Sequence, residues 1–207
     1  MLKRKDLDIH YLEVGAVFAL YEKLQELDRP EQDFKLSKCL SYSLFIFNII
    51  KNRYLEKFPP QLAEKLGHSI NVATASEWIE GFQFLEADGQ TRRPKSPTRY
   101  QLLNWIRNTI THYRDEMPRN TPPPWRRGLT IETRSTDGIR KFAMNGHISK
   151  STDRKPAPMM MGRTDRRRLT KIVKYYVDIY EESLREAGIN VAMSAATERA
   201  RDIETEA

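Results

Sequence analysis

Apolar residues recur every three or four positions through much of the chain, which is the spacing of one face of an α-helix. The first such stripe is broken at Pro30. The next is long, apolar on most sides and broken by Pro59 and Pro60. The last stripe stops before Gly188, a residue type that commonly caps helices. The pattern predicts helices over residues 7–27, 31–58, 61–66, 75–85, 98–117 and 165–187.

The period changes to two after a proline-rich stretch in the second half of the chain. Leu129-Thr130-Ile131-Glu132-Thr133 alternates apolar and polar residues, and Asp137-Gly138 is typical of a tight hairpin turn. Residues 139–148 can form the return strand. We expect loops over residues 87–97, 118–128 and 149–164. These patterns predict one small β-hairpin within an otherwise helical chain.

The expected fold is therefore an all-α helical bundle with a small inserted β-hairpin. A chain of 207 residues is long enough to bury a substantial core as one domain. We expect a single helical domain over residues 1–187, with the linker and hairpin inserted at about 118–164. Residues 188–207 are polar and rich in alanine, and we expect a flexible tail there.

Several features bear on the cellular compartment. No apolar run approaches the ~18–20 residues that span a bilayer, and no apolar stretch follows the basic N-terminal residues as in a signal peptide. The single cysteine, Cys39, excludes an internal disulfide and a cysteine-based zinc cage, and it is expected to pack in the core. We therefore expect a cytoplasmic protein with no membrane partner.

The net charge of +7 is unevenly distributed. The segment 92–174 holds 21 Lys and Arg residues against 6 Asp and Glu, whereas the remainder of the chain is acidic. Charge segregated in this way creates a local positive field that the net value hides. Nucleic acid is the commonest partner of such a segment. A solvated surface and an acidic protein partner are the alternatives.

The chemistry-bearing residues are concentrated late in the predicted helix 98–117. Its sequence Arg107-Asn108-Thr109-Ile110-Thr111-His112 places an arginine and a histidine outside the apolar stripe. At ~100° per residue, Arg107 and His112 lie ~140° apart across the exposed face. A histidine can transfer protons at neutral pH, and an arginine can hold a phosphate and stabilise its transition state. The pair therefore suits RNA cleavage without a metal ion.

The motif Arg107-Asn108-x-x-x-His112, late in a helix of a mostly helical chain, resembles that of the HEPN superfamily. The resemblance implies a four- or five-helix bundle, commonly dimeric, and a metal-independent ribonuclease of toxin–antitoxin or antiviral defence systems. It also implies that Arg107 and His112 are the catalytic pair, with Asn108 as their polar neighbour and with no cofactor. An antitoxin or another regulatory protein is an expected partner.

A homodimer would solve the geometric difficulty posed by the ~140° separation. Two copies of the helix across a two-fold axis would bring an arginine and a histidine from each chain to a shared cleft. We expect Asn104 or Trp105 near that axis, together with apolar groups from the Met159–Met161 run or Trp125.

Further basic residues are candidates for RNA phosphate contacts. Three of them open the last predicted helix, where the helix dipole disfavours positive charge. Trp105 and Trp125 could stack on bases. The predicted nucleic-acid-binding residues are Arg92, Arg93, Arg114, Arg166, Arg167 and Arg168. The alternatives to an enzyme are a non-enzymatic nucleic-acid-binding or adaptor protein, and a structural helical protein with an acidic partner.

Overall fold

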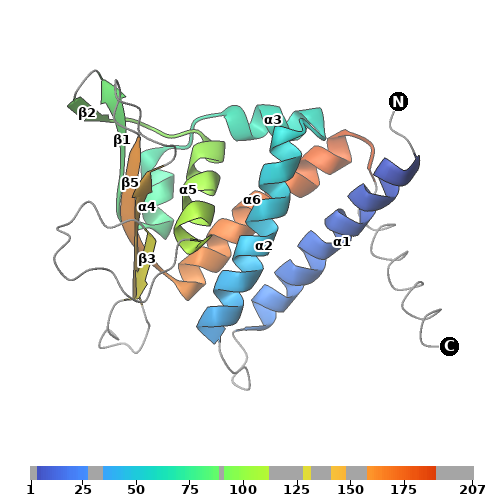
Figure 1. The fold of residues 1–207 in the computed structure, drawn as a ribbon, viewed down its shortest axis with the longest axis horizontal. Coiled ribbons are helices and arrows are strands. Elements are labelled where there is room, and N and C mark those ends of the chain that lie inside the picture. Colours follow the sequence, from blue (N-terminus) through green and yellow to red (C-terminus); the bar gives the residue numbers. More distant parts are fainter. Residues whose placement is uncertain are drawn as a thin grey trace. The chain divides into compact units, whose positions relative to one another are not determined.

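The computed structural model describes residues 4–27, 35–88, 91–111, 128–131, 141–147 and 158–189. Most of these residues are helical, and the strands form one antiparallel sheet (Figure 1). The helices are α1 (Arg4–Glu26), α2 (Lys35–Leu55), α3 (Pro60–Gly67), α4 (Val72–Trp78), α5 (Arg99–Thr111) and α6 (Arg166–Glu186). The strands are β1 (Glu80–Asp88), β2 (Thr91–Pro94), β3 (Gly128–Ile131), β4 (Lys141–His147) and β5 (Met159–Asp165).

The chain divides into two compact units. The first, which we call the helical unit, comprises Met1–Lys65 and Val173–Ala207, and the second, the sheet unit, comprises Leu66–Ile172. Helix α6 begins in the sheet unit and ends in the helical unit. The expected single domain over 1–187 stays a prediction.

In the helical unit, α1 packs against α2. Phe47 of α2 meets Tyr176 of α6 edge to face, with ring centroids 5.8 Å apart. Cys39 is fully buried, which confirms its predicted place in the core. At the end of α6, Gly188 has a φ of 75°, and its N–H donates to the carbonyl of Arg185. The predicted glycine cap is therefore confirmed.

A buried arginine lies within this helical core. The side chain of Arg53 is 4% exposed and forms ion pairs with Glu13 of α1 and with Glu56, whose Oε2 is 2.6 Å from Nη1. Burial raises the pKa of the nearby Tyr180 phenol to about 12, although the positive charge of Arg53 acts in the opposite direction. One cation is thus held in the core by two carboxylates that reach it from more exposed positions.

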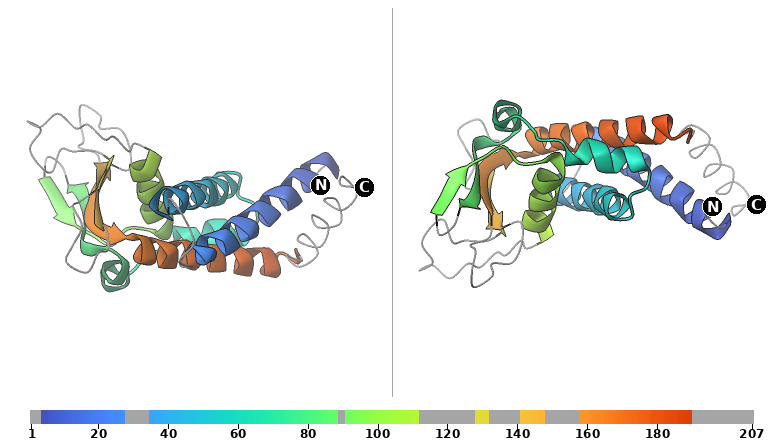
Figure 2. Two further views of the ribbon diagram at one scale, coloured as in Figure 1. Left: turned by 90° about the horizontal axis from the view of Figure 1, so that it is seen from below. Right: turned by 90° about the horizontal axis from the view of Figure 1, so that it is seen from above.

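In the sheet unit, the strand order is β2-β1-β5-β4-β3, and every neighbouring pair is antiparallel. The pairing of β3 with β4 confirms the predicted hairpin. The turn expected at Asp137-Gly138 lies outside the described residues. Helix α5 packs against β3 and β4 and lies along one face of the sheet (Figure 2).

The strand content exceeds the sequence-based prediction in three places. The helix predicted over 75–85 is wrong beyond Trp78, because β1 follows, with Phe82 and Phe84 buried and Gln83 exposed between them. Strand β2 lies within the loop predicted over 87–97, and all of β5 except its last residue lies within the loop predicted over 149–164. Helical predominance is confirmed, whereas the expectation of a lone hairpin is wrong, because the hairpin belongs to a larger sheet.

Strand β5 is fixed between its two neighbours by a close approach of backbone to side chain. A Cβ atom on Gly162 would overlap Cγ2 of Ile79 and lie 3.4 Å from the carbonyl oxygen of Glu80. The hydroxyl of Thr164 donates to the carbonyl of Trp78 at 2.8 Å. A side chain at this position would force Ile79 to shift, so glycine lets β5 lie directly against the corner between α4 and β1.

We expect Gly162→Ala to lower the free energy of unfolding by about 1–3 kcal/mol, because the added methyl group overpacks against Ile79. Urea denaturation would measure the loss. Gly67→Ala is the matched control, since nothing lies within 4 Å of its Cβ position. Equal stability of the Gly162→Ala and wild-type proteins would contradict the close approach.

The buried arginine gives a second prediction. Replacing both Glu13 and Glu56 by Gln leaves the Arg53 cation buried without a countercharge, which should cost about 3–5 kcal/mol of unfolding free energy. Arg53→Met should cost much less, because it removes the buried charge and leaves two carboxylates that can be hydrated.

Glu181→Gln provides the control for this comparison. Its ion pair with Arg185 is exposed, so the change should stay within about 0.5 kcal/mol. Chemical denaturation of these variants would measure each loss of unfolding free energy. A larger loss for Arg53→Met than for the double Glu-to-Gln variant would mean that burial of the unpaired Arg53 cation is not the dominant cost.

Candidate functional site

Helix α5 carries the predicted catalytic motif and is fixed at its start by a reciprocal cap. The N–H of Gln101 donates to the hydroxyl of Thr98 at 3.1 Å, and the N–H of Thr98 donates to Oε1 of Gln101 at 2.8 Å. This is the capping-box arrangement, which satisfies two amides that the helix leaves without partners. The direction of α5 from its first turn is therefore well defined.

The predicted apolar stripe of α5 is confirmed as far as the structure describes it. The buried residues of the helix are Leu102, Leu103, Asn104, Trp105, Ile106, Thr109 and Ile110. Tyr113 and Met117, also expected in the stripe, lie outside the described residues.

Trp105 is fully buried and contacts the ring of Phe82 on β1, with centroids 6.2 Å apart. A base would need an exposed ring to stack upon, so the expected stacking role of Trp105 is wrong. The indole instead joins α5 to the sheet. The expected place of Asn104 or Trp105 near the axis of a homodimer stays a prediction.

Arg107 and Asn108 lie outside the buried stripe and are half-buried. Nη1 of Arg107 donates to Oδ1 of Asn108 at 2.8 Å. The hydroxyl of Thr111 donates to the backbone carbonyl of Arg107 at 2.9 Å. A carboxamide that accepts a hydrogen bond from a guanidinium restricts the orientation of the guanidinium plane. Asn108 therefore orients the side chain of Arg107.

The structure does not test whether Arg107 and His112 converge. His112, Arg114 and Trp125 lie outside the described residues, so their predicted roles stay predictions. The expected homodimer and shared cleft likewise stay predictions.

A polar row runs along α5 on the side away from Ile106. Asn104, Arg107, Asn108 and Thr111 are spaced at i, i+3, i+4 and i+7, which places them on one helical face. Asn104 is nevertheless only 9% exposed, and its Oδ1 has no hydrogen-bond partner among the described residues. The sequence placed Asn104 near the expected dimer axis but did not predict its burial.

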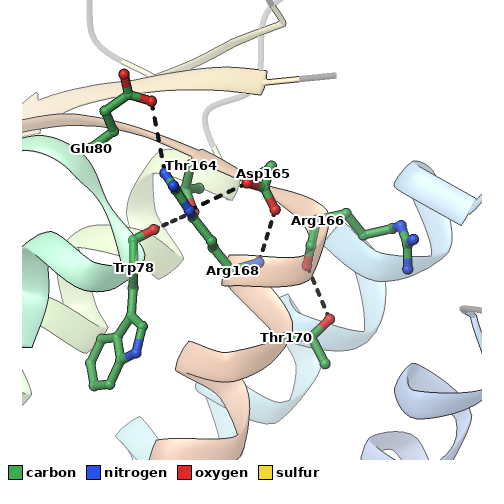
Figure 3. A network of polar contacts seen from close by, with 7 residues as sticks. All are labelled: Trp78, Glu80, Thr164, Asp165, Arg166, Arg168 and Thr170. Carbon is green, nitrogen blue, oxygen red and sulfur yellow. Dashed lines mark hydrogen bonds and ion pairs between the residues drawn. The ribbon is translucent and has the colours of Figure 1, made fainter. Parts of the chain in front are cut away.

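The three arginines that open α6 differ in their surroundings, and Figure 3 shows two of them, Arg166 and Arg168. Nε of Arg168 is 3.5 Å from Oδ2 of Asp165, and its Nη1 is 3.7 Å from Oε2 of Glu80. Oδ1 of Asp165 also accepts the backbone N–H of Arg168 at 2.9 Å and so caps the helix. Arg168 is therefore part of the junction between β5 and α6 and is not a simple surface cation.

Arg167 has different surroundings. Its side chain is exposed, as is that of Lys171 one turn later, and neither forms an ion pair with a described residue. Arg166 is half-buried and has partners of its own. Lys171 was not predicted from the sequence, although the i to i+4 spacing indicates that it shares a face with Arg167.

On β2, Arg93 is exposed and has an interaction within the chain, and Arg92 pairs in register with Ala87 of β1. Both belong to an edge strand of the sheet. Their predicted contact with phosphates is untested.

Metal-ligating side chains do not gather in the described part of the chain. It contains no cluster of three or more His, Cys, Asp or Glu side chains that could hold a metal ion. None of the helices in the same residues is both long and apolar enough to cross a membrane.

Comparison with protein-family models, with curated proteins and with solved structures finds no match to this chain.

Proposed function

We propose that this chain is a metal-independent endoribonuclease of the HEPN type, with Arg107, Asn108 and His112 at its active site. The observation that supports it best is the hydrogen bond between Arg107 and Asn108. The Asn108 side chain, half-buried like that of Arg107, accepts this bond and is suited to hold the guanidinium in a fixed orientation.

In the proposed reaction, His112 transfers protons, and Arg107 stabilises the negative charge of the transition state. A base takes the proton of a ribose 2′-hydroxyl, and that oxygen attacks the adjacent phosphorus. The bond from phosphorus to the 5′-oxygen breaks, and an acid gives that oxygen a proton. The products are a 2′,3′-cyclic phosphate and a 5′-hydroxyl. Arg107 stabilises the negative charge on the phosphorus oxygens in the transition state, and Asn108 keeps its guanidinium oriented.

One histidine cannot be both the base and the acid within a single cleavage step. The proposal therefore includes a homodimer, in which a second His112 serves the complementary proton transfer. By the same resemblance, the proposed setting is cytoplasmic, in a toxin–antitoxin or antiviral defence system, with an antitoxin or a related protein as regulator.

Substrate binding is assigned to the basic part of the sheet unit. Arg167 and Lys171, exposed and without an acidic partner among the described residues, are the best-supported phosphate contacts. Arg168 is a weaker candidate because Asp165 and Glu80 already neutralise much of its charge. Phosphate contacts hold the strand in place but do not select its sequence.

We expect His112→Ala to abolish RNA cleavage in the presence of a metal chelator, because the proton-transfer group is lost. A labelled single-stranded RNA, followed by gel electrophoresis, would measure this. His68→Ala is the matched control, since His68 is an exposed histidine of the sheet unit outside α5. Circular dichroism would verify that both variants fold.

A wild-type protein that binds RNA without cutting it would overturn the enzymatic proposal and favour a non-enzymatic RNA-binding protein. Cleavage by the His112→Ala protein at the wild-type rate would mean that another residue transfers the proton.

The two classes of cation at the start of α6 give a prediction about salt. For single-stranded RNA, each neutralised phosphate contributes a slope of about −0.7 to the dependence of log affinity on log salt. Replacing both Arg167 and Lys171 by Gln should therefore flatten the slope by about 1.4. Fluorescence anisotropy with the His112→Ala background, which leaves the RNA uncut, would measure the slope.

Arg168→Gln is the comparison variant. This variant should have a lower thermal midpoint of unfolding, because it loses the ion pairs with Asp165 and Glu80. The salt dependence of its RNA affinity should be nearly unchanged. The opposite outcome, a flatter slope only with Arg168→Gln, would mean that this arginine leaves its carboxylates to bind RNA.

A further inference from the structure

The two edges of the antiparallel sheet differ in their chemistry. Strands β2 and β3 are outermost, and no strand of the described residues pairs with the outer side of either. Strand β2 reads Thr-Arg-Arg-Pro, and charged residues and proline on an edge strand block its pairing with another chain. Strand β3 reads Gly-Leu-Thr-Ile and has neither a charged residue nor a proline. The β3 edge is therefore the one suited to adding a further strand.

The backbone of β3 already has the conformation that such pairing needs. The strand pairs with β4 along its whole length, from Gly128 opposite Asn145 to Ile131 opposite Phe142. A strand in an antiparallel ladder directs its N–H and C=O groups alternately to its two sides. Strand β4 therefore takes only part of the backbone groups of β3. The others point outward, and a row of this kind is a template for a strand of another chain.

The position of α5 indicates which chain would supply that strand. This helix packs against β3 and β4 and lies along one face of the sheet (Figure 2). If β3 of a second copy paired antiparallel with β3, a two-fold axis would stand perpendicular to the sheet, midway between the two strands. With strands ~4.8 Å apart, the midline between β3 and β4 lies ~4.8 Å from this axis. The two copies of α5 would then lie about 10 Å apart on the same face of the sheet.

This separation matches the ~8–10 Å between the axes of packed helices. One two-fold contact could thus join strand to strand and helix to helix, which makes the β3 side of the sheet complementary to itself. A strand from an unrelated protein would pair with the β3 backbone but would bring no helix to the side of α5. The arrangement therefore favours a second copy of this chain over another partner.

We propose that this chain forms a homodimer through antiparallel pairing of β3 with β3 of a second copy, with the two α5 helices side by side on one continuous sheet. The surface is assigned from the sheet and from α5, and it does not depend on ribonuclease activity. It adds to the proposed function the interface of its dimer, because each α5 carries an Arg107-Asn108 pair to the same axis.

Sedimentation velocity over a dilution series tests the interface. The wild-type protein should be a dimer at micromolar concentration. Thr130→Lys should weaken the dimer at least about tenfold, because two ammonium groups near the axis repel each other. Thr130→Val, which is similar in shape and uncharged, should leave the dimer intact. Thr91→Lys is the matched control, since it places the same charge on the β2 edge, and it should not change the dimer.

Hydrogen–deuterium exchange examines the backbone of the strand directly. The amides of residues 128–131 that point outward should exchange slowly in the dimer and faster when the wild-type protein is diluted until it dissociates. The same amides should exchange fast in the Thr130→Lys protein at all concentrations. Circular dichroism would verify that this variant folds. The dilution experiment needs no variant, so the test remains decisive if the lysine prevents folding.

The outcomes separate this inference from the proposed function. A wild-type monomer at every concentration would overturn the β3 interface, as would a dimer that Thr130→Lys and Thr91→Lys weaken equally. Slow exchange of residues 128–131 that does not depend on dilution would mean that the chain covers its own edge, and it would also overturn the interface. A β3 dimer that cleaves no RNA would overturn the proposed function alone. RNA cleavage by a dimer that Thr130→Lys leaves intact would overturn this inference alone.

Discussion

The packing of α5 against the sheet is the constraint on which the candidate site depends. Trp105 is fully buried against Phe82 of β1, and Ile106 is buried one residue further along. Because an α-helix turns by ~100° per residue, fixing these two side chains fixes the direction of the others. Arg107 must then point to one side of the buried stripe and Asn108 away from it, where both are half-buried and bonded to each other. The site is thus positioned by apolar contacts on the other side of the same helix.

Strand β5 has the corresponding role for the basic end of α6. Gly162 allows the strand to approach Ile79, and Thr164 bonds to the carbonyl of Trp78. The strand ends at Asp165, which caps α6 and pairs with Arg168 (Figure 3). The start of α6 is therefore tied to β1 and to the end of α4 through a few specific contacts. These contacts neutralise the charge of Arg168 and leave the neighbouring Arg167 exposed.

The helices and strands that could be predicted from the sequence are those whose pattern lies within the element itself. The long helices have repeated apolar stripes, and the hairpin has alternation with a turn signal, so both were found. Strand β1 was missed because Trp78, Phe82 and Leu85 have spacings of four and three, which also suit a helix. What makes β1 a strand is its pairing with β2 and with the distant β5, and such pairing leaves no local pattern. Within the site, Arg107 and Asn108 could be found from their motif. The burial of Asn104 could not, because it lies opposite the apolar stripe.

Several charges of α6 run against its dipole, and those at the two ends are compensated differently. Acidic residues near the C-terminal end, where a dipole favours cations, include Glu182 and Glu186. Both bind Lys65, at 2.7 and 2.9 Å, so the chain itself supplies their countercharge. At the N-terminal end, where cations are disfavoured by about 0.3–1 kcal/mol each, Arg168 has carboxylate partners, but Arg167 has none among the described residues. An uncompensated cation at that end gives no benefit to the isolated helix. An anionic partner outside the chain would supply the countercharge, and the RNA phosphates of the proposed function have that chemistry.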